Sequence, residues 1–239
     1  MTARIDIDHG RSKIAASGRS LAQVNVWCMA HLGMPLRGFA MALTARIPVA
    51  RVLCRVVNGD KLMVRLRVFT LTGADGVAVR RIDPINLHVY NTLLKVSNRA
   101  RRGALTHPIH QNFYLIYRML GIHRIDLHAA LTMGGYVWAK SGFLPDSPYA
   151  WRSLANRLLV QWGAERSSVD PMTYRLVERI LNHPSPTSLR ELVDPRFRHP
   201  PSGHSVGRFL LEGESWTGFL DLTNRESVTM YLSETGVLP

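Results

Sequence analysis

The stretch SNRARRGALTHP, residues 97–108, joins two segments of opposite character and decides the fold. Before it, LHVYNTLLKVS (87–97) is apolar and rich in β-favouring residues, as a central strand is. After it, PIHQNFYLIYRML (108–120) places apolar residues at i, i+4, i+7 and i+11, which predicts an amphipathic helix that Gly121 ends. IHRIDLHAAL (122–131) then alternates apolar and polar residues like a second strand. The order strand, turn, helix, strand predicts a βαβ unit.

The turn of this unit is an expected anion site. It carries Arg99, Arg101 and Arg102 and then Gly103, directly before a helix. Backbone N–H groups at a helix start point outward, the helix dipole favours negative charge, and glycine lets a phosphate approach closely. Arginine adds bidentate phosphate contacts. The alternative is a solvated basic turn that binds nothing.

The segments before the unit read as helices and strands. Residues 20–35 predict a helix, and 38–57 predict a helix or a strand. KLMVRLRVFTL (61–71) alternates apolar and basic residues, which predicts a half-buried strand. Extended structure resumes at residues 76–82 after a glycine-containing turn.

The segments after the unit predict a mostly helical extension. Residues 147–162 and 169–182 read as two helices. Residues 183–204 are a connecting chain rich in proline and histidine, and 208–222 predict a β-hairpin that turns near Glu212–Gly213.

The expected fold class is therefore α/β, a mixed twisted sheet with flanking helices and a helical and hairpin C-terminal extension. We expect residues 1–57 to form a helical and strand segment that packs on the core, and residues 58–146 to form the core itself. Residues 147–239 would contribute the C-terminal helices, the proline-rich connection and the hairpin, in one compact unit with the core.

The amino-acid composition indicates which classes of ligand the protein attracts and where it is located. The formal net charge is +13, so nucleic acid, anionic lipid or a phosphate-bearing ligand are expected to be attracted, although the base composition of the genome would also explain an arginine bias. Cys28 and Cys54 stand in apolar surroundings at no metal-ligand spacing, which predicts buried free thiols and no metal site. With no secretory signal and no membrane-spanning stretch apparent, we expect a cytoplasmic protein.

The pieces VYNTLLKVSN, RARRGALT, IHRIDLHAAL and GGYVWAKSGF resemble, in this order, the core of the GNAT N-acetyltransferase superfamily. The resemblance covers roughly residues 60–145. In that superfamily a central strand runs into a basic glycine turn that binds pyrophosphate, a helix and a strand follow, and a short helix ends in Gly-Phe. The residues that match this ending are Gly134, Tyr136, Trp138, Gly142 and Phe143.

The resemblance implies a GNAT-like architecture and an acyl-CoA-dependent N-acyltransferase. The acyl group, acetyl in the simplest case, would move from a CoA thioester to an amine of a small molecule or a protein. The implied cofactor is acetyl-CoA or another acyl-CoA, held by Val96, Arg99, Arg101, Arg102, Gly103, Ala104 and Leu105. The pantetheine arm of the cofactor would lie between the strands at 89–97 and 122–130.

Acyl transfer requires a base for the amine and a proton source for the leaving thiolate. Asp126 and His128 share one face of a predicted strand, and Tyr136 follows on the short helix. These three residues are the candidate catalytic side chains, with a polar strand face and core packing as their alternative explanations. Glu212 and Glu214 near the predicted hairpin turn are a weaker candidate, for holding a cationic amine.

Two other functions stay open. Trp138 stands where the superfamily usually has a tyrosine, and tryptophan cannot supply the proton in that role, which favours a non-catalytic GNAT-like interaction protein. The positive charge favours a basic nucleic-acid-associated protein, such as one that acylates RNA, although the arginines show no recognisable reading helix.

Overall fold

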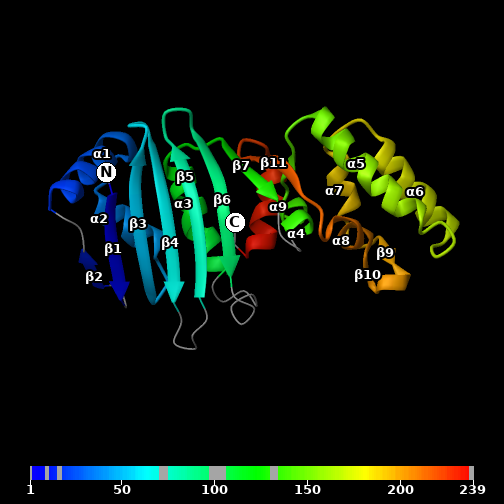
Figure 1. Ribbon diagram of the computed structural model, residues 1–239, viewed down its shortest axis with the longest axis horizontal. Helices are drawn as coiled ribbons and strands as arrows, with labels where there is room; N and C mark the ends of the chain where they lie inside the picture. The colour runs from blue at the N-terminus through cyan, green and yellow to red at the C-terminus, as the bar shows by residue number, and fades with distance from the viewer. Residues whose placement is uncertain are drawn as a thin grey trace. The chain divides into compact units, whose positions relative to one another are not determined.

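The protein is α/β, with a large mixed sheet and flanking helices, as the sequence predicts. The computed structural model in Figure 1 describes residues 2–8, 11–14, 18–69, 75–96, 106–129 and 134–236. The chain divides into two compact units. Met1–Ile125 with Thr235–Pro239 form the N-terminal unit, and Asp126–Glu234 form the C-terminal unit.

The N-terminal unit is built on an antiparallel sheet with the strand order β2-β1-β3-β4-β5-β6. The strands β3 to β6 form a meander, and β1 adds to β3 at its far edge. Their bounds are β1 Thr2–Asp8, β2 Arg11–Ile14, β3 Val49–Val57, β4 Lys61–Phe69, β5 Asp75–Asp83 and β6 His88–Val96. The polar N-terminal strands β1 and β2 are elements that the sequence patterns did not predict.

Strand β4 shows why this sheet has one covered and one open face. Its apolar residues Leu62, Val64, Leu66 and Val68 are fully buried, and the residues between them are half-buried or exposed. Side chains of a strand alternate between the two faces, so the apolar set lies on one side and the basic set on the other. The predicted half-buried strand at 61–71 is confirmed.

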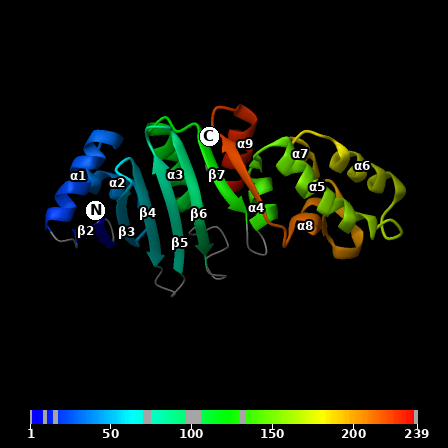
Figure 2. The same ribbon diagram turned by 45° about the horizontal axis from the view of Figure 1, so that its top comes forward.

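Helices α1 (Gly18–Leu32), α2 (Leu36–Leu43) and α3 (Thr106–Met119) cover the apolar face. Figures 1 and 2 show α2 and α3 behind the strands. The Asn112 side chain of α3 donates hydrogen bonds to the carbonyls of Leu43 and Ala45, at 2.9 and 2.7 Å, which fixes α3 against the end of α2. Cys28 and Cys54 are buried free thiols, as predicted, and burial raises the pKa of both, that of Cys28 to about 12.

Helix α3 and strand β7 (Arg124–Ala129) follow β6 in the predicted order. Ile109, Phe113 and Ile116 are buried on one side of the helix, as their spacing predicts. Gly121 has φ +66°, the left-handed conformation that commonly ends a helix, and the chain enters β7 after it.

Helix α4 (Gly134–Lys140) is the short helix of the GGYVWAKSGF segment, and it ends in a Schellman motif. The N–H of Phe143 donates to the carbonyl of Trp138 at 3.1 Å, and the N–H of Gly142 donates to that of Ala139 at 3.0 Å. Gly142 has φ +85°, and the rings of Trp138 and Phe143 pack edge to face with centroids 5.1 Å apart. This hydrophobic contact usually accompanies the motif, so the Trp-x-x-x-Gly-Phe pattern has a structural explanation.

The rest of the C-terminal unit is mainly helical. Its elements are β8 Leu144–Pro145, α5 Pro148–Gly163, α6 Pro171–Asn182, α7 Ser188–Leu192, β9 Arg198–His199, the 3-10 helix η1 Pro200–Ser202, β10 His204–Ser205, α8 Val206–Leu211, β11 Trp216–Asp221 and α9 Arg225–Thr235. The predicted helices at 147–162 and 169–182 are confirmed. Trp151 and Trp162 are buried between them, and their indole N–H groups donate to the carbonyls of His183 and Tyr174.

The predicted hairpin at 208–222 is wrong. Helix α8 occupies its first half, and only the second half is a strand, β11, which pairs antiparallel with β8. Ser205 caps the helix by accepting a hydrogen bond from the N–H of Arg208 at 3.3 Å. The predicted connecting chain at 183–204 likewise contains the short elements α7, β9, η1 and β10.

Candidate functional site

The expected cofactor turn lies outside the described residues. Of its predicted ligands Val96, Arg99, Arg101, Arg102, Gly103, Ala104 and Leu105, only Val96 belongs to a described element. Val96 is the last residue of β6, where it pairs with Gly76 of β5. The candidate turn is therefore flanked by the end of β6 and by the start of α3 at Thr106. The roles of these seven residues stay predictions.

Strand β6 contains a β-bulge four residues before its end. The pairing with β5 runs from Leu93↔Val79 to Asn91↔Arg80, so Thr92 has no partner on β5. A bulge interrupts the ladder and leaves backbone groups unpaired, and bulges are over-represented next to active sites. Thr92 is exposed and Leu93 is 38% exposed, so solvent reaches this part of the strand.

Arg80 holds the bulge together from the covered side of the sheet. Its side chain is 2% exposed, and Nη1 donates to the carbonyls of Val79 at 3.0 Å and Leu93 at 2.7 Å. Its guanidinium carbon lies 5.2 Å from the ring centroid of Phe113. In the part of the chain that the structure describes, no carboxylate forms a salt bridge with Arg80. Carbonyl dipoles and an aromatic face therefore stabilise this buried charge.

Further polar groups lie beside Arg80 under the bulge. Burial lowers the pKa of His110 to about 3, with smaller effects from Arg80 and His107. Burial raises the pKa of Tyr117 to about 12, against the opposing effect of the Arg80 guanidinium. Within the described residues, Asn91 Oδ1 has no hydrogen-bond partner. Neither His110 nor Tyr117 changes protonation near pH 7, so this cluster suits positioning rather than proton transfer.

The three predicted catalytic side chains belong to the C-terminal unit. Asp126 and His128 lie on the same side of β7, since the alternate residues Ile125 and Leu127 are buried. His128 is exposed, and its Nε2 lies 2.8 Å from Ser215 Oγ.

Tyr136 contacts a different segment of the C-terminal unit. It stands on α4, and its hydroxyl accepts a long hydrogen bond of 3.5 Å from Ser205 Oγ at the start of α8. His128 instead contacts Ser215, in the loop between α8 and β11. The structure therefore pairs both predicted residues with serine hydroxyls, which the sequence patterns did not identify.

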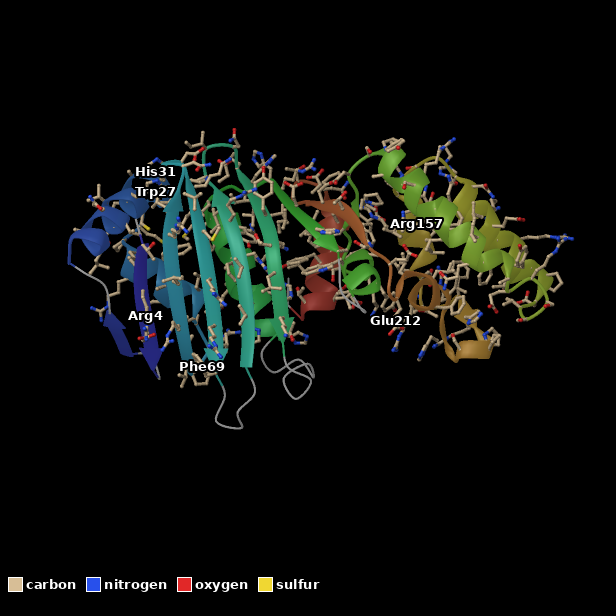
Figure 3. The ribbon with its side chains drawn as sticks, viewed as in Figure 1. Arg4, Trp27, His31, Phe69, Arg157 and Glu212 are labelled. Atoms are coloured by element: carbon tan, nitrogen blue, oxygen red, sulfur yellow. The ribbon has the colours of Figure 1, made fainter. Side chains whose placement is uncertain are left out.

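The carboxylates Glu212 and Glu214 are each held by an arginine of the C-terminal unit. Arg208 Nε lies 3.2 Å from Glu212, and Arg157 Nε lies 3.0 Å from Glu214. Arg157 also donates to the carbonyl of Ser215 at 2.9 Å. Figure 3 labels Glu212 and Arg157 among the side chains. These ion pairs argue against the predicted role of the two carboxylates in holding a substrate amine.

Within the described residues, no group of three or more His, Cys, Asp and Glu side chains is arranged to hold a metal ion. No helix there is both long enough and apolar enough to cross a membrane.

The side of the N-terminal sheet opposite α1, α2 and α3 is strongly basic, and we call it the basic sheet face. The cations on it are Arg4, Arg51, Arg55, Lys61, Arg65, Arg67, Arg81 and Lys95. Among the side chains described on this face, the acidic ones are Asp6 and Asp83. In the sequence these cations look scattered, but they occupy alternate positions of five strands, and the register gathers them.

Comparison with protein families, curated proteins and solved structures gives no significant match to this chain. The fold defines an α/β protein with a large mixed sheet.

Proposed function

We propose that the protein is an acyl-CoA-dependent N-acyltransferase with a GNAT-like core, acting with acetyl-CoA in the simplest case. The observation that carries the proposal is the β-bulge in β6, on the strand that leads into the basic turn at 97–105. Acyl transfer passes through a tetrahedral oxyanion, which fixed hydrogen-bond donors stabilise. A β-bulge leaves backbone groups unpaired on the strand that it interrupts, and such groups are candidate donors beside the predicted pyrophosphate turn.

The surface of β6 beyond the bulge supports the same function. Thr92, Leu93 and Lys95 are exposed and Leu94 is half-buried, whereas every second residue of β3 and β4 is fully buried. The pantetheine arm of CoA is extended and carries amide groups that can hydrogen-bond to backbone groups that a β-bulge leaves unpaired. The basic turn that follows suits the pyrophosphate at the other end of the arm.

The candidate chemistry assigns the roles of base and acid to His128 and Tyr136, which the sequence predicts as catalytic residues. The amine nitrogen attacks the thioester carbonyl, the C–N bond forms, and the C–S bond breaks. His128, oriented by Ser215, would accept the proton of the amine. Tyr136 would donate a proton to the thiolate and be reprotonated from solvent. Trp138 has no proton for that step and packs on Phe143 instead.

We expect CoA to raise the melting temperature and the double variant Arg101→Ala/Arg102→Ala to lose most of this rise. A ligand at a hundred times its Kd stabilises the folded protein by about 2.7 kcal/mol. For a chain of this size, that is a rise of about 5–10 °C. The matched control Arg37→Ala/Arg118→Ala removes the same charge from exposed positions of α2 and α3 and should keep the full rise. Thermal melts over a CoA titration measure both.

No rise for the unmodified protein at millimolar CoA would contradict the cofactor assignment, and an equal loss in the control would contradict the role of the turn. Release of free CoA thiol from acetyl-CoA with a panel of amines then tests the reaction. Binding of CoA without thiol release would favour the non-catalytic interaction protein, as Trp138 at its position suggests.

A further inference from the structure

The register of the N-terminal sheet aligns the side chains of the basic sheet face in rows that cross five strands. The rows are Thr2, Arg55, Met63, Arg81 and Tyr90; then Arg4, Leu53, Arg65, Val79 and Leu93; then Asp6, Arg51, Arg67, Val77 and Lys95. Neighbouring side chains are about 6.8 Å apart along a strand and about 4.8 Å apart between strands. Every row therefore contains at least two cations together with apolar or aromatic side chains.

The acidic side chains described on this face do not balance its positive charge. Asp6 is shared by Arg4 and Arg51, each with a contact of 2.8 Å, and Asp83 is bound by Lys61 at 3.3 Å. A second group of cations on the face consists of the exposed residues Arg55, Arg65 and Lys95. No carboxylate among the described residues forms an ion pair with any of these three. The face therefore carries several cations that are available to an anionic partner.

Guanidinium groups on this face lie over aromatic rings. The Arg81 guanidinium carbon is 4.2 Å from the ring centroid of Tyr90. Near the other end of the strands, Arg67 and Arg51 lie 5.1 and 6.0 Å from the centroid of Phe69. Figure 3 labels Arg4 and Phe69 on these strands. Flat guanidinium and aromatic groups are surfaces on which unstacked bases stack, and arginine also binds phosphates bidentately.

From this combination we infer that the basic sheet face binds single-stranded nucleic acid. The phosphates contact the exposed arginines and Lys95, and bases stack on the Arg81–Tyr90 and Arg67–Phe69 pairs. A flat sheet face has no helix or ribbon to enter a duplex groove, which disfavours double strands. A membrane surface would require an apolar face, and of the described large apolar side chains on this face only Leu93 is exposed. The inference is independent of acyl transfer.

The test measures fluorescence anisotropy of a labelled 15-nucleotide single-stranded RNA, and of a DNA strand of the same sequence, over a range of salt concentrations. We expect binding that weakens steeply with salt. The variant Arg55→Gln/Arg65→Gln/Lys95→Gln should bind at least tenfold more weakly. Its slope of log affinity against log salt should fall by about 2, since each phosphate contact contributes about 0.7.

The matched control is Arg152→Gln/Arg175→Gln/Arg179→Gln, which removes the same charge from exposed positions of α5 and α6. It should keep affinity within about threefold. Equal weakening in both triple variants would overturn the inference, because it would mean that only net charge matters. The absence of both RNA and DNA binding at low salt would also overturn the inference. This holds whether or not the protein binds vesicles rich in phosphatidylserine.

Two further arms address stacking. Tyr90→Leu, at constant charge, should weaken binding by about tenfold without changing the salt slope. A duplex of equal length should bind more weakly than the single strand. Unchanged affinity of Tyr90→Leu together with equal or tighter duplex binding would overturn the preference for single strands. A higher affinity for the RNA strand than for the DNA strand would identify RNA as the ligand of this face, and the reverse would identify DNA.

Discussion

Acidification from pH 7 to pH 4 should lower the free energy of unfolding of the N-terminal unit by about 3 kcal/mol through His110 alone. Burial lowers the pKa of this imidazole from 6.5 to about 3, and Arg80 and His107 add to the effect. Between these two values the unfolded chain binds a proton that the folded chain does not. The stability is therefore complete above pH 6.5 and falls as the pH decreases towards 3.

The pH window isolates His110 from the carboxylates. The pKa values of Asp6 and Asp83 are below 3.8, because hydrogen bonds and ion pairs outweigh the effect of their burial. Their contribution to stability is present above pH 3.8 and is lost only at lower pH. Between pH 4 and pH 6.5 these two carboxylates add little to the slope.

Urea unfolding at several pH values between 4 and 7 checks this prediction. His110→Gln keeps a polar side chain of similar size that does not titrate, so the variant should lose most of the slope of stability against pH. The exposed His123→Gln is the control and should keep the slope of the unmodified protein. A His110→Gln protein with an unchanged slope would show that another group causes the acid sensitivity.

Elements whose signal is local could be predicted from the sequence. The alternation of 61–71 gave strand β4 and its buried face, because a strand with one covered side has no other way to bury its apolar residues. The periodicity of 108–120 gave α3. The predicted helix at 169–182 is α6, and Asp170 caps it by accepting hydrogen bonds from the N–H groups of Met172 and Thr173.

Elements that depend on tertiary contacts could not be predicted from the sequence. The apolar run in 208–222 favours a strand as much as a helix, and packing selects α8. Gly207 in this helix lies so close to the end of α7 that a Cβ would stand 2.8 Å from Val193 Cα. No local pattern reveals that contact. The same is true of the partners of His128 and Tyr136, since Ser215 and Ser205 lie 87 and 69 positions away.

The basic sheet face is a candidate site that could not be predicted from the sequence, for a similar reason. Arg80 and Arg81 are adjacent in β5, yet Arg80 is buried under the bulge and Arg81 lies over Tyr90 on the open face. The sequence predicts that two neighbouring strand residues point in opposite directions. It does not say which one points inward, because that depends on the register of the whole sheet.

The glycine pair at the start of α4 should separate into one essential and one replaceable position. A Cβ on Gly135 would collide with the carbonyl oxygen of Leu211 and stand 2.9 Å from that of Glu214. Both neighbours are backbone atoms, so a local side-chain movement cannot relieve the contact. A Cβ on Gly134 would have its nearest neighbour at 3.8 Å. We expect Gly135→Ala to destabilise the C-terminal unit by about 2–3 kcal/mol, and Gly134→Ala to be neutral or stabilising by about 0.5 kcal/mol.

The two substitutions are matched, because both add one methyl group and the same helix propensity to adjacent residues of one helix. Their difference therefore reports the close approach of α4 to the loop between α8 and β11, where Trp216 Nε1 also donates to the Gly135 carbonyl at 3.3 Å. Thermal melts should show a loss of about 4–10 °C for Gly135→Ala. Equal destabilisation by both variants would mean that the start of α4 tolerates no side chain and that the contact with Leu211 and Glu214 is not the cause. Tyr136 follows Gly135 directly in the chain. If only Gly135→Ala is destabilising, we therefore also expect this substitution to displace the Tyr136 hydroxyl from Ser205, and Gly134→Ala to leave that hydroxyl in place.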